Sequence, residues 1–150
     1  MIDSQSQQRI IEWIKEAEQG GAEILTGGER YKGSVKPTVI TGTTEDMKIR
    51  SQEIFGPVVV IENLKGRNIT EILNDSSFGL NAGVFTSDFE EALQLSNDLD
   101  YGQVLINDVP TVRFDHMPYN GRRHSGYGTE GIKYAIKEMS QLKMVSLKYV

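Results

Sequence analysis

The chain has 150 residues, of which 38% are hydrophobic and 25% charged, and its formal net charge at pH 7 is −5. This length and composition are typical of one folded globular domain with a core of its own. The negative charge disfavours nucleic acid as a partner, and the absence of cysteine excludes disulfides, thiolate nucleophiles and cysteine-based zinc sites.

Two further function classes are disfavoured. The longest aliphatic run, Val58–Ile61, is far shorter than the ~20 residues of a membrane helix, and the first residues are too polar for a secretory signal. We therefore expect a soluble, cytoplasmic protein with no membrane partner. The two histidines, His116 and His124, lack the i, i+4 spacing of a helical metal pair, so we expect no metal site.

The first part of the chain predicts a helix followed by short strands. Ser4-Gln-Ser-Gln7 has the form of a capping box, and apolar residues then recur at helical spacing until Gly20-Gly21. Residues 22–25 and 38–41 are typical of short strands, and a helical turn is expected near residues 45–50.

From residue 58 the pattern becomes regular. The run at 58–61 predicts a strand buried on both faces, followed by a helix over 69–74, a strand over 82–86 and a strand over 104–107. Between the last two, Ser87-x-x-Glu90 has the form of a second capping box, and a helical stripe follows that includes Phe89, Ala92, Leu93 and Leu99. This order predicts an α/β fold, a mostly parallel twisted sheet flanked by helices, with no internal linker.

The last part predicts loops over residues 108–128, then a helix that carries Ile132, Ala135, Ile136 and Met139. The alternating tail from Leu142 to Tyr149 predicts a final strand.

Three glycines, Gly126, Gly128 and Gly131, have the G-x-G-x-x-G spacing of dinucleotide-binding loops. That loop must follow a buried strand and needs an acidic residue about 20 positions later. Residues 117–124 are unsuited to a buried strand, and no acidic residue follows at the required distance. We therefore interpret these glycines as shaping a tight loop rather than a nucleotide site.

A resemblance appears when separated motifs are taken together. Lys36-Pro-Thr-Val, Glu53-Ile-Phe-Gly-Pro57-Val-Val and Met117-Pro-Tyr-Asn-Gly-Arg-Arg-His-Ser-Gly-Tyr-Gly occur in this order, with Asn107 between the last two. In this arrangement the whole chain resembles the C-terminal part of NAD(P)-dependent aldehyde dehydrogenases. The last motif and the residue after it depart from the family pattern at Asn120, Arg123 and Thr129, where glycine, lysine and arginine are common. Asn is tolerable at residue 120 because it adopts left-handed backbone readily.

The resemblance implies that Glu53 hydrogen-bonds the ribose hydroxyls of NAD or NADP and that Phe55 packs beside the ribose and the nicotinamide. The residue types suit these roles, since a carboxylate accepts two hydroxyl hydrogen bonds and an aromatic face is a flat apolar wall. Without the resemblance, Glu53 would be interpreted as a solvated charge and Phe55 as core.

The resemblance also implies what the chain does not contain. In the family a cysteine thiolate attacks the aldehyde and a glutamate activates water, and both precede the segment resembled here. We therefore expect residues 1–140 to be a partial catalytic domain and residues 141–150 an oligomerisation strand. The expected partners are a small aldehyde, an N-terminal cofactor-binding half and further copies of the chain. The chain alone is expected to be inactive.

Arg113, Asp115 and His116 fall in the segment that in the family borders the substrate tunnel. Our hypothesis is that Arg113 selects hydroxylated or anionic aldehydes such as lactaldehyde, glyceraldehyde or succinic semialdehyde, because guanidinium binds anions in fork geometry. The alternative is a solvated or subunit-bridging arginine. For the chain as a whole, a non-catalytic assembly module is the competing class.

Overall fold

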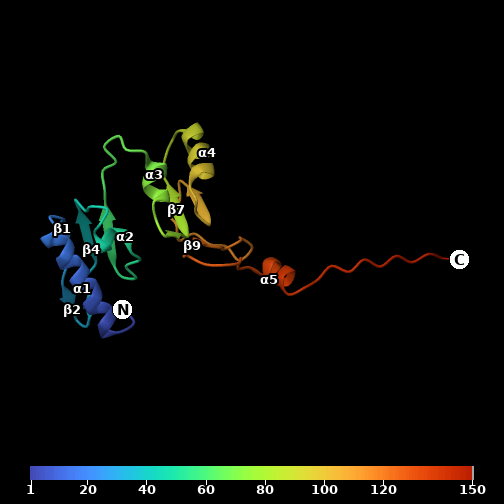
Figure 1. Ribbon diagram of the computed structural model, residues 1–150, viewed down its shortest axis with the longest axis horizontal. Coiled ribbons are helices and arrows are strands. Elements are labelled where there is room, and N and C mark those ends of the chain that lie inside the picture. The colour runs from blue at the N-terminus through green and yellow to red at the C-terminus, as the bar shows by residue number, and fades with distance from the viewer. Residues whose placement is uncertain (150) are drawn as a thin grey trace. The chain divides into compact units, whose positions relative to one another are not determined.

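The fold divides into two compact units, Met1–Asn68 and a second that begins at Ile69. It is described for residues 1–149 by a computed structural model (Figure 1). The division corrects the expectation of a chain without an internal boundary: residues 62–68, which are mostly polar, end the first unit.

The first unit packs a long helix against one face of a small sheet. It contains α1 (Ser4–Gln19), β1 (Glu23–Thr26), β2 (Arg30–Tyr31), β3 (Ser34–Val35), β4 (Thr38–Thr41), α2 (Lys48–Ser51) and β5 (Val58–Ile61). β4 lies between β1, which is antiparallel to it, and β5, which is parallel. Ile10 and Ile14 of α1 and Ile40 of β4 are fully buried in the core.

Only one face of β5 is buried, which corrects the expectation of burial on both faces. Val58 and Val60 pack against the core of the first unit, whereas Val59 is 57% and Ile61 50% exposed. The physical reason is that the core built from α1 and β4 packs against the face that carries Val58 and Val60, and the opposite face is left uncovered. The apolar run Val58–Ile61 therefore predicted the strand correctly, but not which of its two faces is buried.

A charged network holds the end of the first unit. The Glu62 carboxylate accepts hydrogen bonds from Arg50, from Thr43 at 3.1 Å and from Arg67 at 3.2 Å. Burial alone would raise the pKa of Glu62, but these hydrogen bonds and the charge of Arg50 outweigh it and lower the pKa below its ordinary value. Glu62 is therefore ionised in the folded state.

The second unit contains the strand–helix–strand part of the prediction. Its elements are α3 (Ile69–Asn74), β6 (Phe78–Gly79), β7 (Asn81–Val84), α4 (Phe89–Asp98), β8 (Gln103–Ile106), β9 (Arg122–Arg123) and α5 (Ile132–Glu138). β7 and β8 are parallel, as expected, but they form their own ladder instead of continuing the sheet of β5. Their core includes Val84, Leu95 and Leu99.

The residues that cap α1 and α4 each lie one position from the serine expected from the capping boxes. Asp3, not Ser4, caps α1, its Oδ1 accepting from the Ser6 amide at 2.6 Å, and Asp88, not Ser87, caps α4. Carboxylates are favoured there because they also face the positive end of the helix dipole.

The tail is not assigned to a strand. Residues 140–149 follow α5 as an extended segment without secondary structure (Figure 1). A strand is defined by hydrogen bonds to a neighbour, and the described part of this single chain places none beside the tail. The oligomerisation role of residues 141–150 stays a prediction. No helix within residues 1–149 combines the length and the apolarity that crossing a bilayer would require.

Candidate functional site

The loop of residues 52–57, called the Phe55 loop below, connects α2 to β5 and carries both residues expected to contact a cofactor. Glu53 is exposed. Phe55 is 76% exposed, and its backbone φ is +49°. An aromatic residue with positive φ is strained and persists only where its surroundings determine it.

Contacts on both sides of Phe55 fix this loop. The guanidinium of Arg9 donates to the Ile54 carbonyl at 2.8 Å, and the Thr38 amide donates to the Pro57 carbonyl, also at 2.8 Å. A Cβ on Gly56 would lie 2.3 Å from Cδ1 of Ile10, so a larger residue at this position would force either the Ile10 side chain or the loop to move. Arg9 has no local signal in the sequence, because its contact joins residues 45 positions apart.

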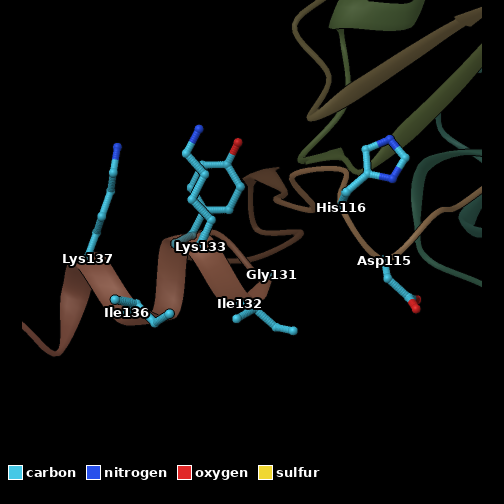
Figure 2. A pocket seen from close by; sticks show the side chains of 8 residues that line it. Asp115, His116, Gly131, Ile132, Lys133, Ile136 and Lys137 are labelled. Atoms are coloured by element: carbon cyan, nitrogen blue, oxygen red, sulfur yellow. The ribbon is translucent and has the colours of Figure 1, made fainter.

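The other two predicted site residues, Arg113 and His116, lie in the second unit. His116 stacks on Phe114 with ring centroids 6.0 Å apart. Together with Asp115 it lines a hollow of about 690 Å³ whose other wall is α5 (Figure 2). Figure 2 shows Lys133 and Lys137 projecting from one side of α5 and Ile132 from the other.

Arg113 does not line this hollow. Its Nη2 lies 2.9 Å from Oε2 of Glu130, and its guanidinium lies 4.1 Å from the centroid of the Tyr119 ring. The backbones of these two neighbours also bond to each other, since each amide donates to the other's carbonyl, at 3.2 and 2.7 Å. Arg113 is therefore half exposed and is held by Glu130 and Tyr119 of its own chain, the two residues whose backbones close the 119–130 loop.

The glycine-rich stretch forms a tight loop, as expected. Gly126, Gly128 and Gly131 all have positive φ. The strand before them is only the two-residue β9, which pairs antiparallel with β6, so the context of a dinucleotide loop is absent there. Asn120 does not have positive φ, so its place in the loop does not depend on left-handed backbone; that conformation falls on Arg123, at φ +54°.

Arg123 joins this loop to the rest of the second unit. Its guanidinium donates to the carbonyls of Asn74 at 3.1 Å, Phe78 at 2.7 Å and Asp100 at 3.0 Å. It also pairs with the Asp100 carboxylate at 3.3 Å. The planar fork of arginine serves several acceptors at once, which an ammonium does less well.

Comparison with known proteins identifies the class. The profile of the Aldehyde dehydrogenase family matches residues 1–145, and the chain belongs to this family. A 3-sulfolactaldehyde dehydrogenase from Priestia aryabhattai is 41% identical over 98% of this chain, and a lactaldehyde dehydrogenase from Methanococcus maripaludis is 42% identical over 97%. The chain spans only 31% of the length of each.

Solved structures agree with the family. The glyceraldehyde-3-phosphate dehydrogenase of Methanocaldococcus jannaschii, complexed with NADP, superposes with a TM-score of 0.88 at 33% identity, over 95% of this chain and 31% of its own. An aldehyde dehydrogenase from Bacillus cereus in complex with NAD+ gives 0.85 at 38% identity, over 95% and 30%. The fold is that of aldehyde dehydrogenase domains.

Proposed function

We propose that this chain is the C-terminal part of the catalytic domain of an NAD(P)-dependent aldehyde dehydrogenase, which oxidises a small aldehyde to its carboxylic acid in the cytoplasm. The observation that carries the proposal is the Phe55 loop. An exposed carboxylate at residue 53 precedes an exposed, backbone-strained Phe55, in a loop held from both ends.

The residues of the loop fit a nicotinamide cofactor. Glu53 would accept hydrogen bonds from the ribose hydroxyls, and the face of Phe55 would lie along the ribose and the ring. When bound, the nicotinamide accepts a hydride. Glu53 and Phe55 contribute binding and orientation of the cofactor, which lower the barrier by fixing the geometry of the reacting groups.

The chain by itself is expected to be inactive, because it contains no cysteine to act as nucleophile. The direct test is to combine it with an N-terminal half that supplies the cysteine and to follow formation of NAD(P)H. Glu53→Ala should raise the cofactor KM, whereas Glu18→Ala, which removes an exposed carboxylate from α1, should not. If the unsubstituted chain, Glu53→Ala and Glu18→Ala all give the same cofactor KM for NAD(P)H formation, the proposed role of the loop is contradicted.

For the substrate, we assign Arg113 to recognition of a negatively charged or hydroxylated group of the aldehyde. We also assign His116, which lines the hollow described above, to substrate binding. The similarity to a protein named for sulfolactaldehyde, which carries a sulfonate, supports an anionic substrate. Arg113 is half exposed and is held by Tyr119 and Glu130, so its remaining N–H groups are oriented in advance.

Arg113→Ala in the complete enzyme should lower kcat/KM for an anionic aldehyde about 10- to 100-fold, the loss expected for a hydrogen bond to a charged group. The value for a neutral aldehyde of similar size should change little. Arg122→Ala removes another half-exposed arginine of the second unit, which lies near Asp100, and is the matched control. Equal losses for both substrates would mean that Arg113 has only a structural role.

The competing function is a non-catalytic assembly module. Exposed apolar residues in the tail favour it: Leu142, Met144, Leu147 and Tyr149 are all at least 80% exposed. Oligomerisation of the chain without any activity after combination with an N-terminal half would support this alternative.

A further inference from the structure

Helix α1 touches the Phe55 loop at two consecutive residues. Arg9 donates from Nη2 to the Ile54 carbonyl at 2.8 Å, and Ile10, which is fully buried, lies against Gly56. These contacts fall on the residues immediately before and after Phe55. The loop is therefore held on both sides of Phe55, whose backbone is strained and whose ring is exposed.

Arg9 is itself held in place. Its guanidinium carbon lies 4.4 Å from the centroid of the Trp13 ring, one helical turn further along α1. Cation–π stacking restricts the orientation of the guanidinium. Trp13, Arg9 and the Ile54 carbonyl thus form a connected series from the helix to the loop.

The strain explains why such a support is needed. A non-glycine residue at φ +49° costs free energy of its own, and an unsupported loop relaxes toward ordinary conformations. A ligand that binds only one conformation is bound less tightly in proportion to the fraction of molecules that hold it. Whatever keeps Phe55 in place therefore sets the affinity of its ligand.

We propose that Arg9 and Ile10 are positioning residues, which fix the left-handed conformation of Phe55 and thereby the affinity for the cofactor. This inference rests on the proposed function for its ligand, but the conformational part concerns the chain alone. Ile10 limits how near the loop lies to α1, and Arg9 orients the peptide that precedes Phe55.

The first test measures the loop without any cofactor. In the full chain, a strong intraresidue NOE between the amide and Hα protons of Phe55 reports positive φ. Arg9→Met, which keeps the aliphatic stem and removes the donors, should abolish it, and Arg9→Lys should retain it in part. Arg30→Met is the matched control, since Arg30 bonds to the exposed Gln8 and not to the loop. An unchanged signal in Arg9→Met overturns the proposal.

The second test uses shape. Gly56→Ala places a Cβ against Cδ1 of Ile10 and should displace the loop, whereas Gly56→Ala combined with Ile10→Val removes the methyl group concerned and should restore it. Failure of the double variant to recover the Phe55 signal, while it stays folded by circular dichroism, counts against the role of Ile10.

The third test separates this inference from the proposed function. In the reconstituted enzyme, Arg9→Met should raise the cofactor KM about tenfold and leave kcat at saturating cofactor nearly unchanged. If the Phe55 signal is lost but the cofactor KM does not move, the positioning role holds and the assignment of Phe55 to the cofactor is wrong.

Discussion

Removal of the Arg123 side chain should destabilise the second unit more than any other single arginine loss there. The guanidinium donates to three carbonyls, those of Asn74, Phe78 and Asp100. Hydrogen bonds from a charged donor contribute about 1.5 kcal/mol each at the lower end of their range. Nε of Arg123 is buried without a partner, and this offsets about 1–2 kcal/mol. The expected loss for Arg123→Met is therefore about 3 kcal/mol.

Arg122→Met is the matched control. The Arg122 side chain is half exposed, and its Nε lies 3.8 Å from the Asp100 carboxylate. Exposed ion pairs of this kind contribute at most about 1 kcal/mol. Arg123→Lys, which restores the residue that is common in the family, should lie between the two, because one ammonium does not replace three diverging N–H donors.

The assay is amide hydrogen exchange of the β7–β8 ladder, which reports the opening free energy of the second unit directly. Fluorescence of Trp13, the only tryptophan in the chain, reports on the first unit in the same samples. If Arg123→Met opens the ladder no more readily than Arg122→Met, the three carbonyl contacts contribute little to the stability of the second unit.

Three further predictions concern the first unit and the tail. The pKa of Glu62 in the folded state lies below its ordinary value of 4.5. The stability that ionised Glu62 contributes is therefore complete above about pH 4.5 and is lost as the pH falls through the folded pKa. Glu62→Gln should make stability, followed by Trp13 fluorescence, fall less steeply at acid pH. An equally steep fall in the variant would refute this. Ile14→Ala should cost about 3 kcal/mol in urea unfolding, since Ile14 is fully buried, and a loss below about 1 kcal/mol would mean that the core collapses around the gap. Sedimentation should detect oligomers of the chain that are lost on deletion of residues 141–150, and a stable 16.8 kDa monomer at high concentration would contradict the oligomerisation role.

The sequence predicted most elements because their signals are local. The strands at β4, β5, β7 and β8 and the helices α1 and α4 all fall within a few residues of their expected ranges. The errors concern what covers each element. Around α4, Ala92 and Leu99 of the expected stripe are buried, but Phe89 and Leu93 are 74% and 50% exposed, and Leu95 completes the buried face. Two helical stripes fit that segment, and tertiary packing chose one.

The site was predicted through motif resemblance more than through physical pattern. Glu53 and Phe55 were singled out by the order of residues 53–57, while the strained φ of Phe55 has no signal in its residue type. Arg9 and Glu130 escaped notice because each acts on a residue far away in the chain, Ile54 and Arg113 respectively. Long-range contacts of single side chains leave no periodicity to detect.

The uncovered face of β5 has a practical consequence for production of the protein. Val59 and Ile61 expose apolar surface beside an open strand edge, an arrangement that recruits further strands in an uncontrolled way. The polypeptide made alone should therefore lose part of its yield to aggregation, and its soluble fraction is the material for measurements on the isolated chain. Under the proposed function, co-expression with the N-terminal half, rather than mixing of purified pieces, should cover β5 early and raise the soluble yield.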